Sequence, residues 1–140
     1  MKFLRKLVLV PALAVVTLLA SCEKEDVVKV DSQLTGTWQL EAITYGLSQT
    51  TVRGAQLPYS EKIEFSGTNY TQTRDGKVES SGRCYTGESQ KNAPYKSAVI
   101  YPDDNTYQAY EISEGRLYLY ERGTQGSVVA DGSLYEYKRQ

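Results

Sequence analysis

From Leu34 to the end of the chain, short stretches of alternating apolar and polar residues are separated by turns rich in glycine and aspartate. Alternation with a period of two is typical of strands that bury one face, and no window shows a convincing helical period. Asp75-Gly76 and Glu114-Gly115 fall between such stretches, where they predict hairpin turns. A chain with this pattern is expected to form an antiparallel all-β fold.

The alternation predicts eight strands, most of them joined to the next by a short turn. The expected strands are residues 37–45, 59–66, 68–74, 77–85, 95–101, 106–113, 116–121 and 128–139. An even number of antiparallel strands joined as neighbours favours an up-and-down barrel or a sandwich. A barrel would also remove the exposed edges of the sheet.

The first 21 residues have the features of a bacterial export signal. Lys2, Arg5 and Lys6 precede an apolar run from Leu7 to Leu19, which ends in small residues. A run of thirteen residues is too short to cross a bilayer comfortably, so a cleaved signal peptide is favoured over a membrane-spanning helix.

The tetrapeptide Leu19-Ala20-Ser21-Cys22 follows this run and resembles the lipobox of bacterial lipoproteins in all four positions. The resemblance implies cleavage before Cys22, a thioether-linked diacylglycerol on that cysteine and a third acyl chain on its amino group. Two or three acyl chains hold a protein firmly on a membrane, whereas one binds only marginally. We therefore expect a signal peptide at 1–21, a lipidated tether at 22–33 and a folded domain at 34–140.

The expected location is the cell envelope of a Gram-negative bacterium, with the lipid anchor in the outer membrane. The acidic residues that follow Cys22 either direct the protein to the cell surface or form a solvated spacer. With Cys22 lipidated, Cys84 has no cysteine partner in the chain, so a disulfide framework is excluded and a buried thiol is expected.

Charge and composition exclude several classes of function. Without the signal peptide the chain carries 13 lysines and arginines against 17 acidic residues, a balance of about −4, which argues against a nucleic-acid partner. The sequence contains no histidine, which removes the commonest general base and every zinc site with an imidazole ligand. We therefore expect a protein that is not an enzyme and that has no catalytic residues, metal or cofactor.

Gly36-Thr37-Trp38 opens the first expected strand, and Arg139 ends the last one. With these residues the chain resembles small lipocalin-like proteins, and more narrowly the short lipocalin-like domains of bacterial envelope lipoproteins. In that family the tryptophan packs beneath an arginine of the last strand at the closed end of the barrel, and the resemblance implies this role for Trp38 and Arg139. Such a cation–π contact contributes roughly 0.5–2 kcal/mol. The resemblance thus implies an eight-stranded antiparallel up-and-down barrel.

The family usually holds a small apolar or amphipathic molecule inside the barrel, so the resemblance implies binding or transport of a small hydrophobic ligand. The inward-facing candidates for ligand contact are Leu40, Ile63, Phe65, Val99, Tyr110, Leu119 and Tyr137. The same residues equally fit a filled core, because eight strands enclose either side chains or one small ligand. Ser80, Ser97 and Gln108 share the inward phase and favour a pocket, because buried polar groups need partners.

Twelve tyrosines against two phenylalanines support an alternative interpretation. Tyr118 and Tyr120 alternate with Leu117 and Leu119, so they are expected to point outward if the leucines point inward. A filled barrel with exposed tyrosines and loops would be a structural or interaction module that binds a protein or a glycan. Cross-strand tyrosine pairs that only stabilise the sheet explain the same pattern.

Overall fold

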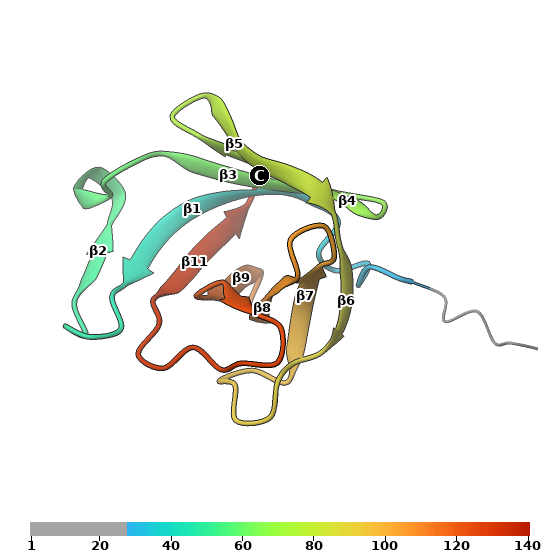
Figure 1. Cartoon of the computed structure of the whole chain (residues 1–140). Helices are drawn as coiled ribbons and strands as arrows, with labels where there is room; N and C mark the ends of the chain where they lie inside the picture. The colour runs from blue at the N-terminus through green and yellow to red at the C-terminus, as the bar shows by residue number, and fades with distance from the viewer. Residues whose placement is uncertain (1–27) are drawn as a thin grey trace, which may run out of the picture.

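The computed structural model describes residues 28–140, which form one curled antiparallel β-sheet (Figure 1). Its main strands are β1 (Gly36–Thr44), β3 (Glu61–Ser66), β4 (Asn69–Arg74), β5 (Lys77–Arg83), β6 (Tyr85–Glu88), β7 (Ser97–Tyr101), β8 (Thr106–Ser113), β9 (Arg116–Tyr120) and β11 (Leu134–Arg139). They are ordered β5-β4-β3-β1-β11-β9-β8-β7-β6 through the sheet. The short strands β2 (Thr51–Arg53) and β10 (Gly123–Thr124) pair with β1 and β8, and a 3-10 turn, η1 (Gly54–Gln56), follows β2.

The expected signal peptide and Cys22 lie outside the described residues. Within residues 28–140, the structure has no helix with the length and apolar character needed to span a bilayer.

The prediction of an all-β fold is confirmed, and the local signals explain why these residues form strands. In β3 the residues Glu61, Ile63 and Phe65 are buried while the residues between them are exposed. At the hairpin Asp75-Gly76 both residues have positive φ, 47° and 77°, as the tightest two-residue turns require. Such turns make a strand pair with the next one in the sequence, and strands paired in this way form an antiparallel meander.

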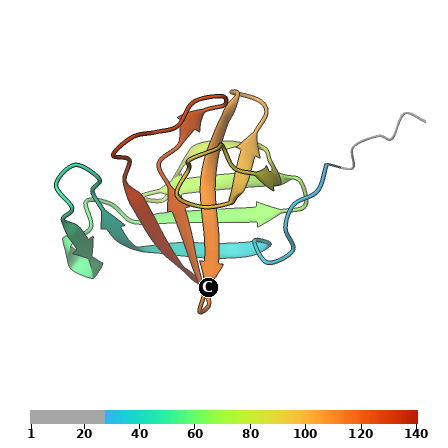
Figure 2. The same cartoon turned by 90° about the horizontal axis from the view of Figure 1, so that it is seen from below.

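The two ends of the sheet are joined by a single residue. β5 and β6 stand at opposite ends of the strand order, yet only Cys84 separates them in sequence. Because consecutive Cα atoms are about 3.8 Å apart, the sheet has to curl until its ends meet at this residue. Figure 2 shows the result, with β1, β3 and β4 crossing β7 and β8 at a steep angle.

Two expected boundaries were wrong. The strand expected at 77–85 breaks at Cys84, and the strand after the break, β6, continues along β7 to Glu88. The final strand, expected from Val128, begins at Leu134. The segment before it instead packs against side chains of β8 and β9. Its Ser127 carbonyl accepts a 2.7 Å hydrogen bond from the Tyr107 hydroxyl, and Gly132 N donates a 2.8 Å bond to the Tyr120 hydroxyl.

The core lies inside the curl of the sheet. It is formed mostly by large apolar and aromatic side chains: Leu34, Trp38, Leu40, Ile43, Ile63, Phe65, Tyr70, Cys84, Val99, Tyr101, Tyr110, Leu117, Leu119 and Tyr137. Among the described residues, Glu61 is the single charged or polar residue classed as buried, at 1% exposure. A buried carboxylate in a small domain requires partners, and these partners define the site described below.

Candidate functional site

Trp38 and Arg139 are in contact at one end of the curled sheet. The guanidinium carbon of Arg139 lies 4.1 Å from the centre of the Trp38 ring, and Trp38 Nε1 donates a 2.8 Å hydrogen bond to the Leu34 carbonyl. Gly36 has φ +126°, and a Cβ at this position would lie 2.8 Å from Arg139 Nη1. The glycine is therefore favoured by the backbone conformation, and an added Cβ would also displace the end of the Arg139 side chain.

The seven residues expected to contact a ligand are all buried. Six of them fill the core and do not line the interior cavity, which is described in the next paragraph. The seven residues are Leu40, Ile63, Phe65, Val99, Tyr110, Leu119 and Tyr137, each at most 5% exposed. Tyr137 lines the interior cavity. Leu40 and Tyr110 also contribute to grooves outside this cavity.

A partly enclosed cavity of about 140 Å³ lies further along the strands from Trp38. In the strand register, Arg139 pairs with Trp38, whereas Tyr137 and Tyr135 lie progressively further along β11. The lining is polar, in contrast to the apolar core: Glu61, Gln72, Arg74, Gln108, Glu121, Arg122, Tyr135 and Tyr137.

One part of the lining is an ion pair between the buried Glu61 and the partly exposed Arg74, and the Tyr137 phenol also binds Glu61. Arg74 donates two hydrogen bonds to Oε2 of Glu61, at 3.0 and 2.9 Å, and the Tyr137 hydroxyl donates a 2.5 Å bond to Oε1. Burial and the neighbouring Glu61 carboxylate raise the pKa of Tyr137 well above its ordinary value. The phenol therefore stays protonated and acts as a donor to Glu61 at neutral pH.

Arg74 is held from two further sides. Its guanidinium carbon lies 3.9 Å from the centre of the Tyr59 ring, and Nη1 reaches Glu79 at 3.5 Å. Burial alone would lower the pKa of Arg74, but the hydrogen bonds and charge of Glu61 raise it above the ordinary value. The cation is therefore fixed in place and its charge is matched by Glu61.

A second part of the lining is formed by Glu121 and Arg122. Oε2 of Glu121 accepts hydrogen bonds from Ser133 N at 3.1 Å and from the Tyr135 hydroxyl at 3.4 Å. Arg122 lies 3.8 Å from the centre of the Tyr101 ring, and its Nη2 donates to Asp104 at 2.8 Å. This guanidinium is thus stacked and oriented by its neighbours.

Two consecutive side chains reach the same cavity because β9 is interrupted here. Leu119 pairs with Tyr110, and Gly123 in β10 pairs with Tyr107. The chain advances by four residues from Leu119 to Gly123 while β8 advances by three, so one extra residue is accommodated between them. A bulge of this kind breaks the alternation and redirects a side chain, which explains the shared orientation of Glu121 and Arg122.

Cys84, the cysteine among the described residues, is buried and does not line the cavity. Burial raises the pKa of Cys84 to about 11, so this buried thiol is protonated at neutral pH. Among residues 28–140, no group of three or more Cys, Asp or Glu side chains is placed to hold a metal ion.

The polar residues expected to indicate a pocket are divided between three environments. Gln108 lines the cavity, and its amide is held by the Tyr120 carbonyl at 3.0 Å and the Tyr101 hydroxyl at 2.8 Å. Ser80 Oγ is paired with the Tyr70 hydroxyl at 2.7 Å, and Ser97 faces an outer groove.

Five cavity residues were missed by the sequence interpretation: Glu61, Gln72, Arg74, Glu121 and Arg122. A signal existed for the first three, because Glu61 has the same phase as Ile63 and Phe65, and Gln72 and Arg74 have the phase of Tyr70. Their polarity argued against an inward position. No comparable signal existed for the other two, since the bulge removes the alternation.

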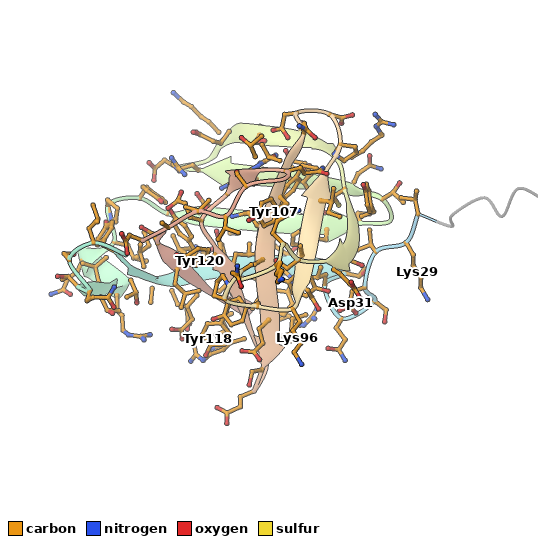
Figure 3. The ribbon with its side chains drawn as sticks, turned by 60° about the horizontal axis from the view of Figure 1, so that its bottom comes forward. Lys29, Asp31, Lys96, Tyr107, Tyr118 and Tyr120 are labelled. Atoms are coloured by element: carbon orange, nitrogen blue, oxygen red, sulfur yellow. The ribbon has the colours of Figure 1, made fainter. Side chains whose placement is uncertain are left out.

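The tyrosines expected to point outward lie outside the core cluster, but one of them is partly covered. The Tyr120 hydroxyl accepts a hydrogen bond from Gly132 N, and its ring lies close to that glycine. Tyr118 pairs across the sheet with Glu111 and Glu136. Figure 3 shows Tyr118 and Tyr120 on β9, with Tyr107 on the neighbouring strand β8.

Part of the expected tether is packed on the sheet. The carbonyl of Lys29 accepts a 2.9 Å hydrogen bond from Thr86 N in β6, and Asp31 N donates a 2.9 Å bond to Thr86 Oγ1. Asp31 and Lys96 line a groove of about 520 Å³ with Tyr95 and Glu111 (Figure 3). Lys29 and Asp31, which belong to the segment assigned to the tether, therefore contact the sheet.

A scan against protein-family profiles, a search of curated proteins and a search of solved structures each found no match to this chain.

Proposed function

We propose that this chain is a lipid-anchored envelope protein whose eight-stranded barrel binds a small molecule in its interior cavity without catalysing a reaction. The observation that carries the proposal is the cavity of about 140 Å³ beside the buried Glu61–Arg74 pair, inside a sheet that is otherwise filled by side chains.

The eight-stranded barrel follows if β5 and β6 act as one strand bent at Cys84. Its first half pairs with β4 and its second half pairs with β7, which joins the two ends of the sheet. Two further contacts support this closure. Cys84 N donates a 2.8 Å hydrogen bond to the Thr68 carbonyl, and Arg83 N donates a 2.9 Å bond to Asp103 in the turn between β7 and β8.

The size of the cavity restricts the ligand. Pockets for drug-sized molecules measure about 300–1,000 Å³, whereas a cavity of about 150 Å³ accommodates a molecule the size of benzene. A cavity of about 140 Å³ suits a ligand of similar size to the latter and is too small for a lipid chain. The hydrophobic ligand implied by the lipocalin resemblance stays a prediction, but the polar lining favours a ligand with polar groups.

Native mass spectrometry of the protein purified from membranes in detergent tests this proposal. We expect a fraction of the protein to carry a small non-covalent adduct. Gln72→Phe should remove the adduct, because Gln72 lines the cavity and the larger ring would fill it. Thr71→Phe is the matched control, since Thr71 lies on the same strand with the opposite phase. Absence of any adduct from the wild-type protein, or equal occupancy in both variants, would argue against binding in this cavity.

The membrane anchor has its own test. Cys22→Ser removes the proposed attachment site of the acyl chains, so the variant should leave the membrane fraction on cell fractionation. A Cys84→Ser variant, which keeps the lipobox, should stay with the membrane. Continued membrane association of Cys22→Ser would contradict the proposed lipidation.

A second proposal, an interaction module that binds a protein or a glycan, is favoured by the outer groove of about 520 Å³. Its lining combines the Tyr95 ring with Lys96 and Glu111, which supply both an aromatic surface and hydrogen-bonding groups. Tyr95→Ala should abolish capture of a glycan or protein partner without changing the thermal unfolding of the domain. Unchanged capture by this variant would argue against the groove.

A further inference from the structure

We propose that the interior cavity selects a small zwitterion of about the size of an α-amino acid, with its ammonium group at Glu121 and its carboxylate at Arg122. This inference rests on the proposed function, since it names the ligand class of the same cavity. Some polar groups of the lining already have partners within the protein, and others do not.

Most of the polar lining is fully engaged within the protein. Both oxygens of Glu61 accept hydrogen bonds, from Arg74 and from Tyr137. Both ends of the Gln108 amide are likewise paired, with Tyr101 and the Tyr120 carbonyl. These groups shape the cavity and have little capacity left for a ligand.

Glu121 is the lining carboxylate whose charge is not matched. Its hydrogen bonds come from a backbone N–H and a phenol, both neutral, and both go to Oε2. Within residues 28–140 no Lys or Arg nitrogen lies within ion-pair distance of it, whereas Glu61, the other lining carboxylate, is paired with Arg74. The free oxygen of Glu121 is thus an acceptor for a cationic donor on a ligand, which makes a stronger hydrogen bond than a neutral donor.

Arg122 and Gln72 supply the complementary groups. Nε and Nη2 of Arg122 donate to Thr106, Tyr70 and Asp104, but in the described part of the chain Nη1 has no acceptor. Its stacking on the Tyr101 ring fixes the direction of the guanidinium. The side-chain amide of Gln72 likewise forms no hydrogen bond with the described residues. These donors suit a carboxylate.

The charge balance of the lining points to a zwitterion more than to a simple ion. The lining contains two carboxylates, Glu61 and Glu121, and two guanidinium groups, Arg74 and Arg122. The ion-pair partner of Arg122, Asp104, lies outside the lining and is 53% exposed, so solvent screens its charge more than those of the lining groups. A ligand with a net charge would disturb this balance in a partly enclosed space, where charges are poorly screened. A molecule with one charge of each sign leaves the balance unchanged, and an α-amino acid with a small side chain fits the available volume.

The test is titration calorimetry on the whole protein with four probes of similar size: L-alanine, propionate, ethylamine and benzene. Propionate lacks the ammonium group and ethylamine lacks the carboxylate. Each should bind at least about tenfold more weakly than L-alanine, because each loses one charge-assisted hydrogen bond. Benzene, which has no polar group, should not bind measurably.

A pair of variants assigns the ammonium site. Glu121→Gln keeps the shape of the side chain but removes its charge, so it should weaken L-alanine about tenfold or more and leave propionate unchanged. Glu64→Gln is the matched control, because Glu64 is exposed on the outer face of β3. A two-dimensional NMR spectrum of each variant establishes that the fold is intact.

The outcomes separate the ligand class from the proposed function. Equal affinities for L-alanine and propionate, preference for benzene, or an unchanged L-alanine affinity in Glu121→Gln would overturn the zwitterion and leave small-molecule binding in place. A native adduct of another class, with none of the four probes bound, would do the same. If no probe binds and no adduct is present, the cavity holds only water and both proposals fail.

Discussion

The phenol of Tyr137 donates a 2.5 Å hydrogen bond to Glu61, although the two residues lie 76 positions apart in the sequence. Tyr137 is in β11 and Glu61 begins β3, and β1 separates these strands in the sheet. The bond therefore crosses the interior from one side of β1 to the other. Arg74 in β4 also donates to Glu61, so β3, β4 and β11 are connected through one carboxylate that is 1% exposed.

Removing the carboxylate should strongly destabilise the domain. Glu61→Ala leaves Arg74 without its main counter-ion, and since this arginine is 33% exposed the loss should lie below the value of about 3–5 kcal/mol for a fully buried pair. Urea unfolding followed by tryptophan fluorescence measures the change. Glu79→Ala is the control, because Glu79 pairs with the same arginine at 3.5 Å but is 51% exposed. That exposed pair should contribute no more than about 1 kcal/mol. Similar losses in both variants would contradict the importance of the buried pair.

Gly36→Ala should destabilise the domain by more than a glycine substitution that only strains the backbone. The new Cβ would meet Arg139 Nη1 at 2.8 Å, at a φ of +126° that other residues rarely adopt. We expect a loss of about 2–4 kcal/mol, since backbone strain of this kind costs about 1–3 kcal/mol and the cation–π contact about 0.5–2 kcal/mol. Gly67→Ala is the comparison, because its φ is +57° with nothing within 4 Å of the added Cβ. If Gly36→Ala and Gly67→Ala lower the free energy of unfolding equally, displacement of Arg139 does not destabilise the domain.

Stability should fall steeply in alkaline solution. Burial raises the pKa of Tyr137 and Tyr101 in the folded protein, whereas the unfolded chain has ordinary tyrosine pKa values of about 10. The stabilising contribution is complete below about pH 10 and is lost as the pH rises above that value, because the unfolded state then releases protons that the folded state retains. The urea midpoint between about pH 8 and pH 11 measures this, and Tyr137→Phe should show a shallower decline. A midpoint that stays constant to pH 11 would be inconsistent with the raised pKa values.

Cys84 should react with thiol reagents only when the domain unfolds. Burial raises the pKa of its thiol from 9.0 to about 11, which lowers the thiolate fraction about a hundredfold near neutral pH. Reaction with Ellman's reagent should thus be at least about a hundredfold slower in buffer than in urea. A Tyr101→Ala variant, which opens space in the core around the thiol, should react faster than the wild-type protein. Rapid labelling of the native wild-type protein would contradict the buried position.

The strands were largely predictable because their signals are local. Asp75-Gly76 and Glu114-Gly115 have the positive φ values that the hairpin turns require, and this chemistry is visible in the sequence. The change of sheet partner at Cys84 was not predictable. Nothing in the residues around Cys84 distinguishes a strand that bends and changes partner from one that ends, since that choice depends on pairing with β7.

The cavity was only partly accessible to sequence analysis. Gln108 was expected from its phase, while Glu61 and Arg74 were overlooked because charged residues are rarely buried unless they are paired. Their pairing depends on β3 and β4 lying side by side in the register that places Glu61 opposite Arg74. The shared orientation of Glu121 and Arg122 depends on a bulge. The bulge adds one residue to the strand, and no feature of the sequence indicates where it occurs.

The pairing of β1 with β11 has a consequence for the order of events during synthesis. Trp38 is opposite Arg139, so the first strand obtains this neighbour only after the roughly hundred residues between them have been made. Contacts between such distant residues are slow to form, and until they do the Trp38 ring lacks its cover. A chain without residues 134–140 would lose β11 and, with it, the pairing partner of two other strands. It would expose both β1 and β9 as unpaired edges, in the condition that favours association with other chains.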